Sequence, residues 1–254
     1  MVLYSDTDAN KSYPIILDLG TGLTVFAGQQ PLDGSFRGVA FLSHLHFDHI
    51  QGLPFFAPVD RAGAQLVIYG PSENGISLAE SMGVLIGSPY FPVMLSDLSG
   101  EIVIGTIDEN GIDLDQPGHP KVFPCLVDHT NATFGYRIEI DGKVIVYIPD
   151  HQAPSDNRRT KDSVLELCQS ADILIHDAQY TNEEFGEKAH WGHSTYDFAM
   201  WIASRAMVKL LVFFHHDPRR SDHELEAIEL HYQELAGPSG LRVLAAREGE
   251  ALQI

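Results

Sequence analysis

The chain has 254 residues, of which 44% are hydrophobic and 20% charged, and this balance excludes a disordered or fibrous protein. Two cysteines cannot form a disulfide framework, so we expect a reducing compartment. The 16 Lys and Arg against 35 Asp and Glu give a net charge of −19, which repels extended nucleic acid. The sequence shows neither a signal-peptide pattern nor an apolar run of membrane-spanning length, so we expect a cytoplasmic protein with no membrane partner.

Apolar runs of strand length recur along the chain and predict a sheet-rich protein. In chain order they cover residues 14–19, 38–42, 65–69, 101–107, 121–127, 133–140, 143–148, 172–175, 209–214 and 241–245. Helical patterns interleave with them at residues 76–82, 161–169, 194–207 and 222–235. The alternation predicts an α/β fold, and because there is no repeat or linker-like shift in composition, we expect a single domain over residues 1–254.

Residues 133–148 predict a β-hairpin, with Asp141 and Gly142 as the turn and alternating apolar residues on either side. This antiparallel pair argues for mixed sheets rather than a purely parallel sheet. The least regular stretch, residues 71–99, is expected to be a covering loop more than a separate domain.

The densest group of metal-ligating residue types is Ser43-His44-Leu45-His46-Phe47-Asp48-His49, directly after the predicted strand 38–42. Two histidines spaced i, i+2 at an extended strand end point the same way. The Asp-His pair that follows, at a helix start, can aim at a neighbouring point. The pattern therefore predicts two adjacent metal ions.

Two ions need further ligands, and the chain offers them where other predicted strands end. His129 follows strand 121–127, Asp150 follows strand 143–148, and His215 follows strand 209–214. His216 is the alternative to His215, but His215 closes its strand directly and is preferred.

The segments SHLHFDHIQGLPFF, VDHT, VYIPDH and LVFFHHDP, in this order and spacing, resemble the metallo-β-lactamase-fold hydrolase superfamily. The resemblance implies a four-layer αβ/βα sandwich of two mixed sheets with helices outside. It also implies that one ion is bound by His44, His46 and His129, a second by Asp48, His49 and His215, and both by a bridging Asp150. Mixed imidazole and carboxylate ligands suit zinc first, with manganese or iron as alternatives.

Two other features of the resemblance concern the start of the chain. Asp18, in ILDLG, matches an aspartate that supports a metal-ligating histidine through its second ring nitrogen. Related phosphodiesterases begin with a Gly-rich strand before this segment, whereas about a dozen polar residues stand here. We therefore expect that first strand to be missing or supplied differently.

A second pair of motifs, ADILIHDAQYT at 171–181 and WGHST at 191–195, resembles the phosphodiesterase branch of the superfamily, which includes tRNase Z and cyclic-phosphate phosphodiesterases. Asp177 and His193 match an acidic residue and a histidine that pair as orienter and proton donor. The tRNA-processing enzymes have glutamate where this chain has Asp177. This departure, together with the net charge, disfavours a tRNA substrate.

The expected function is hydrolysis of a small cyclic phosphodiester by metal-bound hydroxide, with Asp48 orienting the attacking water or taking its proton and with Asp177 and His193 assisting the leaving group. The expected partner is a small anionic substrate, and a homo-oligomer is left open. Two alternatives are a lactonase or thioesterase of the same fold and a non-catalytic metal-dependent sensor.

The remaining histidines and the basic pairs carry weaker expectations. His176 is expected to be structural, and His151 and His190 are candidates for the pocket. His119, His223 and His231 lie in polar surroundings and are expected to be solvated. The largest basic groups are pairs, Arg158-Arg159 and Arg219-Arg220, and the second pair follows His215 closely enough to reach the rim of a pocket.

Overall fold

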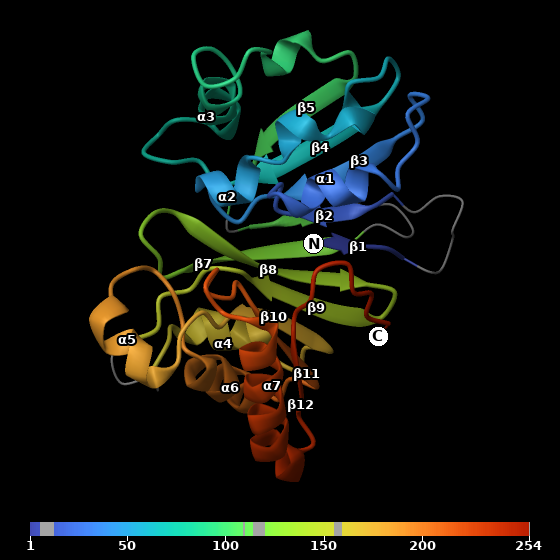
Figure 1. Ribbon diagram of the computed structural model, residues 1–254. Coiled ribbons are helices and arrows are strands. Elements are labelled where there is room, and N and C mark those ends of the chain that lie inside the picture. Colours follow the sequence, from blue (N-terminus) through green and yellow to red (C-terminus); the bar gives the residue numbers. More distant parts are fainter. Residues whose placement is uncertain (6–12, 109, 114–119, 155–158, 254) are drawn as a thin grey trace. The chain divides into compact units, whose positions relative to one another are not determined.

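The computed structural model describes residues 1–5, 13–108, 110–113, 120–154 and 159–253, so the predictions for His119 and Arg158 lie outside the described residues. The described residues divide into two compact units, one within residues 1–110 and the other within residues 111–253 (Figure 1). Each unit contains one mixed sheet with helices packed against it. The single domain over residues 1–254 stays a prediction.

The first unit contains a five-stranded sheet in the order β1-β2-β3-β4-β5. Its strands are β1 (Val2–Leu3), β2 (Ile15–Leu17), β3 (Arg37–Phe41), β4 (Gln65–Gly70) and β5 (Glu101–Thr106). Strands β2 to β5 are parallel, whereas β1 runs antiparallel to β2, with Val2 opposite Ile16. The strand that the sequence analysis expected to be missing or differently supplied is thus represented by a two-residue edge strand.

Short helices follow the strands of the first unit. They are α1 (Gly22–Ala27), α2 (Phe47–Ile50), α3 (Leu78–Leu85) and the 3-10 turns Leu53–Phe55, Ala57–Val59 and Leu95–Asp97. Helix α3 overlaps the helix predicted at residues 76–82, inside the stretch that was otherwise expected to be a covering loop. It begins with a reciprocal capping box between Ser77 and Glu80 and buries Leu78 and Met82 in the core of this unit.

The second unit contains a seven-stranded sheet in the order β12-β11-β10-β9-β8-β7-β6. Its strands are β6 (Ile112–Asp113), β7 (Lys121–Val127), β8 (Thr133–Ile140), β9 (Lys143–Ile148), β10 (Ile173–Asp177), β11 (Leu210–Phe214) and β12 (Arg242–Ala245). Strands β6 to β9 pair antiparallel and β9 to β12 pair parallel. The β8–β9 hairpin pairs Ile140 with Lys143 around the turn that its sequence predicted.

The described part of this unit contains four α-helices. They are α4 (Asp162–Cys168), α5 (Asn182–Lys188), α6 (Tyr196–Arg205) and α7 (Asp222–Ala236), and a 3-10 turn Gly237–Ser239 follows α7. Helix α4 contacts β7 and β8, α6 contacts β10 and β11, and α7 contacts β12. None of the helices in the described part of the chain has the length and apolar content that crossing a bilayer would require.

The topology of the second sheet explains why chemistry-bearing residues gather at one edge. Strands β9, β10 and β11 are parallel neighbours, so their carboxyl ends meet at the same edge. Asp150 follows β9, Asp177 ends β10 and His215 follows β11. Strand β7 runs in the same direction because two antiparallel pairings separate it from β9, which brings His129 to this edge as well. The carboxyl edge of parallel strands is where α/β folds bind ligands.

A matched pair of glycines tests the close packing of the first unit. A Cβ atom on Gly52 would overlap the backbone carbonyl oxygen of Gly20 and lie 2.8 Å from that of Leu19, whereas one on Gly83, in α3, would meet nothing within 4 Å. We expect Gly52→Ala to lower the free energy of unfolding by about 3 kcal/mol, because backbone must move. Gly83→Ala should raise it by roughly 0.5–1 kcal/mol through helix propensity.

Urea denaturation of the two variants beside the parent chain measures both effects. Equal midpoints for the two variants would contradict the close approach of Gly52 to the Gly20 carbonyl.

Candidate metal-binding site

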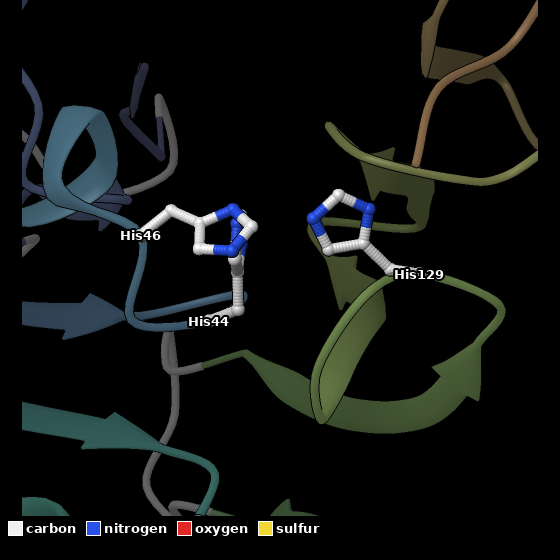
Figure 2. Close-up of side chains that lie close together, drawn as sticks. All are labelled: His44, His46 and His129. Atoms are coloured by element: carbon white, nitrogen blue, oxygen red, sulfur yellow. The ribbon is translucent and has the colours of Figure 1, made fainter. Parts of the chain in front are cut away.

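The histidine motif of the first unit begins where β3 ends and continues into α2. His44 and His46 lie with their ring centroids 4.4 Å apart, and those of His44 and His49 are 4.2 Å apart. Figure 2 shows the side chains of His44 and His46, together with that of His129 from the second unit. Asp48 lies in the first turn of α2, largely exposed, and its Oδ2 is 3.4 Å from Nε2 of His49. The local fold therefore gathers three imidazoles and a carboxylate within one short segment.

A buried carboxylate, Asp18, fixes the orientation of two of these histidines. Its oxygens accept hydrogen bonds from the Ser43 backbone N–H at 2.7 Å, from the Ser43 hydroxyl at 2.9 Å and from Nδ1 of His49 at 2.8 Å. Because the single hydroxyl proton of Ser43 goes to Asp18, Oγ of Ser43 accepts from Nδ1–H of His44 at 3.0 Å. Both imidazoles, when neutral, then carry their lone pair on Nε2, the arrangement typical of metal-ligating histidines.

The charge state of Asp18 follows from these contacts. Burial raises the pKa of this carboxyl, but the opposing charge of His49 and the hydrogen bonds from His49 and Ser43 outweigh burial and hold its pKa below the ordinary value. Asp18 is thus an ionised orienting group near neutral pH, as the family resemblance implied. The sequence alone indicated one supported histidine, whereas the contacts include two.

The second unit brings Asp150, His193 and His215 together, with one ligand atom of each within 4.8 Å of the others. Oδ1 of Asp150 lies 3.4 Å from Nδ1 of His193, 3.7 Å from Nε2 of His215 and 3.9 Å from Nε2 of His129. The rings of His193 and His215 stack with centroids 4.9 Å apart. Buried carboxylate oxygen and imidazole nitrogen are the donors that divalent zinc, manganese and iron bind, so this donor set fits a metal ion.

Asp177 is fully buried beside this cluster and bonds to the loop that carries His193. Its Oδ2 accepts hydrogen bonds from Nδ1 of His193 at 3.1 Å and from the backbone N–H groups of His151 and Ser194, and its Oδ1 accepts from the N–H of Gln179. Burial raises the pKa of Asp177 to about 6, although the hydrogen bond and charge of His193 act in the opposite direction. The pairing of Asp177 with His193 that the sequence predicted is therefore present as a direct contact.

His129 and His215 are also held through Nδ1. Nδ1–H of His129 donates to the backbone carbonyl of Gly192 at 2.7 Å, and the side-chain amide of Gln179 lies 3.0 Å from Nδ1 of His215. Gly192 has φ +94°, and a Cβ there would lie 2.6 Å from Nδ1 of His129, so glycine is required at this position. Sequence reasoning missed this role of Gly192; its place directly before His193 was the available signal.

The side chains of His216, Arg219 and Arg220 bond to groups that are not candidate metal ligands. Nε2–H of His216 donates to the backbone carbonyl of Ala246 at 3.2 Å. The guanidinium of Arg219 pairs with Asp217 at 3.0 Å, and that of Arg220 pairs with Glu184 at 2.6 Å. The charge of each arginine is thus already matched by a carboxylate within the unit.

A buried histidine pair supports the turn after Asp150. Nδ1–H of His176 donates to the backbone carbonyl of Asp177 at 2.7 Å, so its Nε2 accepts from Nδ1–H of His151 at 3.0 Å. Burial lowers the pKa of His176 to about 4 and that of His151 well below its ordinary value, which favours the neutral forms this chain of bonds requires. His151, a pocket candidate by sequence, is part of this packed support.

The other histidines of the sequence analysis lie on the surface. His190, also a pocket candidate by sequence, is exposed in the segment after α5, and His223 and His231 are exposed on α7. They contribute no buried donor to either group of candidate ligands.

Comparison with known proteins identifies the class to which this fold and these residues belong. Residues 15–216 match the model of the beta-lactamase superfamily domain, and the chain belongs to this superfamily. The predicted fold class, α/β with two mixed sheets flanked by helices, is thereby confirmed.

Individual relatives are distant. The chain is 26% identical to a ribonuclease Z of Natronomonas pharaonis over 215 residues, which cover 69% of each protein. Among solved structures it is similar to the metallo-β-lactamase fold protein YhfI from Bacillus subtilis, with 19% identity and a TM-score of 0.68 over 97% of this chain and 94% of that one. It is also similar to a diphosphatase of the PhnP family, with 21% identity and a TM-score of 0.66 over 95% and 80% of the two chains.

The role of Asp18 is testable by a substitution that keeps its size. Asp18→Asn removes the charge and one of the two oxygens that hold His49 and Ser43, and through Ser43 it loosens His44. We expect the zinc affinity of the chain to fall roughly 10–100-fold, the usual effect of losing a partner behind a metal ligand. Competition against a chromogenic chelator measures this affinity.

Asp33→Asn is the matched control, since Asp33 is an exposed aspartate of the same unit that bonds to Ser35. Identical zinc affinities for the two variants would show that Asp18 does not orient ligands.

Proposed function

We propose that this chain is a phosphodiesterase that uses two divalent metal ions, zinc first among them, to hydrolyse a small cyclic phosphodiester. The observation that carries the proposal is the contact of His193 with both Asp177 and Asp150, because it joins a candidate proton donor to a candidate metal ligand. The names of the relatives support it, since ribonuclease Z and a diphosphatase are both named for cleaving bonds at phosphorus.

In this proposal the ligands are those that the resemblance implies: His44, His46 and His129 for one ion, Asp48, His49 and His215 for the other, and Asp150 for both. When bound, the two ions lower the pKa of a water molecule and polarise the phosphoryl oxygen. Their +4 charge against the −2 of Asp48 and Asp150 makes the site locally positive within an acidic protein. A compact anion is attracted to such a site, whereas a long polyanion meets the repulsion of the remaining surface.

His193 is the proposed general acid. Asp177 accepts its Nδ1–H at 3.1 Å, so a protonated His193 presents its second proton at Nε2 for donation to the departing alkoxide. Asp177 cannot turn away, because backbone N–H groups of His151, Ser194 and Gln179 also hold it. The exposed carboxylate of Asp48 is the proposed group that orients the attacking water or accepts its proton.

The thioesterase and the sensor alternatives make less use of these residues. A thioesterase expels a thiolate, which needs little protonation, and a non-catalytic sensor needs no proton donor at all. An RNA substrate, which the ribonuclease Z relatives favour, is opposed by the net charge of −19 and by Arg219 and Arg220, whose charges are paired with Asp217 and Glu184. We therefore keep a small cyclic phosphodiester as the proposed substrate.

Metal content and substrate class are tested in one panel. We expect about two equivalents of zinc or manganese per chain by elemental analysis, and activity that a chelator removes and either metal restores. Bis-p-nitrophenyl phosphate and cyclic nucleotides should be hydrolysed faster than lactones, thioesters or precursor tRNA. A chain that takes up no transition metal would refute the proposal. Cleavage of precursor tRNA at the rate of the best cyclic phosphate would show instead that the chain is an RNA-processing enzyme.

The general acid is tested by leaving-group dependence. In His193→Ala we expect turnover of alkyl esters, whose alkoxides leave poorly, to fall on the order of 10²–10⁴-fold, and turnover of p-nitrophenyl esters to fall far less, because p-nitrophenolate leaves without a proton. Steady-state rates on both substrate types, with metal content checked, measure the difference. His223→Ala, an exposed histidine of α7, is the control, and equal losses on both substrates in His193→Ala would exclude the acid role.

A further inference from the structure

The first unit contains a cavity of about 570 Å³ with four aromatic residues among the nine that line it. Phe47, Phe55, Tyr90 and Phe91 line it together with apolar residues, and Gln51 is the polar residue of the lining. A volume of this size lies within the range of small-molecule sites in proteins. The residues that line it include no charged side chain.

Three of its four aromatic side chains are largely exposed to solvent. Phe47, Phe55 and Tyr90 are 65%, 62% and 73% exposed, although large aromatic side chains are usually buried. Phe91 packs against the core of the unit and meets Phe55 edge to face, with centroids 5.7 Å apart, which gives the cavity a fixed wall. A group of exposed aromatic rings around a hollow marks a binding surface.

The cavity is continuous with the candidate metal ligands along the chain. Helix α2 contributes Phe47 and Ile50 to the lining and carries Asp48 and His49 between them. A molecule in the cavity would therefore lie against the same single turn of helix that holds two proposed ligands. The Tyr90 and Phe91 walls come from the stretch after α3, which the sequence analysis treated as a covering loop.

We infer that this cavity binds a flat aromatic group, of the kind a nucleobase provides, on the phosphodiester that the proposed function hydrolyses; the inference rests on that proposed function. Aromatic faces favour stacking with a planar ring, and the amide of Gln51 offers both a donor and an acceptor to the edge of a heteroaromatic ring. Because the lining carries no charge, the phosphate has no counter-ion there and stays at the metal ligands. The substrate is thus oriented with its aromatic group in the cavity and its phosphate at the metal ligands.

Substrates with one leaving group and different second ester groups test this orientation. Stacking on aromatic side chains contributes about 1–3 kcal/mol per base, a factor of roughly 5–150. For the metal-loaded chain we expect kcat/KM, divided by the uncatalysed rate, to be about 10–100-fold higher for phenyl p-nitrophenyl phosphate than for the methyl or cyclohexyl diester.

The phenyl-to-methyl ratio should drop at least fivefold in Phe55→Ala and in Tyr90→Ala, whose side chains are largely exposed. Phe123→Ala, a 42% exposed phenylalanine on β7 of the other unit, should keep the parent ratio. A cyclohexyl diester as good as the phenyl diester would overturn the inference in favour of a general apolar site.

Binding to the metal-free chain separates this inference from the proposed function. By calorimetry we expect adenosine to bind, ribose not to bind measurably, and Phe55→Ala and Tyr90→Ala each to weaken adenosine binding about tenfold. Adenosine binding without hydrolysis of any diester would refute the proposed function and support the aromatic site. Diester hydrolysis with no aromatic preference and no adenosine binding would overturn the aromatic site alone.

Discussion

The buried carboxylate of Asp18 is the contact on which the histidine motif of the first unit depends. Parallel pairing of β2 with β3 sets Leu17 opposite Phe41, and the Asp18 N–H donates to the Phe41 carbonyl, so Asp18 reaches Ser43 and His49 directly. Burying a carboxylate is unfavourable, and the three donors that surround it offset that cost. The register between β2 and β3 therefore determines the ring orientation of His49 directly and that of His44 through Ser43.

Asp177, at the end of β10, orients His193 in the second unit in the same way. Its neighbours β9 and β11 are followed by Asp150 and His215, and its own oxygens accept hydrogen bonds from N–H groups of three separate loops. In both units one strand-end carboxylate holds a histidine by Nδ1. The donors that fix Asp177 are backbone N–H groups of three loops, whereas Asp18 is held by the backbone N–H and the hydroxyl of Ser43.

The sequence was informative wherever a strand end determined the geometry. The runs before His44, Asp150 and His215 were apolar and short, so both the strands and the placement of the polar residues after them followed from local pattern. Contacts between loops that are distant in sequence could not be predicted from local pattern. The Gly192 carbonyl bonds to His129 across 63 positions of sequence, and the His151–His176 pair spans 25. The short helices α1 and α5 were missed because a single or double turn shows little apolar periodicity.

The aromatic cavity adds a physical reason for a small substrate that net charge alone does not supply. Repulsion by the acidic surface weakens binding of every anion, whereas stacking in an uncharged cavity is insensitive to that field. Binding energy obtained far from the reacting bond accelerates the reaction only if it holds the phosphorus more firmly in the transition state than in the ground state. In the proposal the link between the cavity and the metal ligands is helix α2, whose single turn carries Phe47 and Ile50 in the cavity lining and Asp48 and His49 among the proposed ligands, so a ring bound in the cavity would position the phosphate at those ligands.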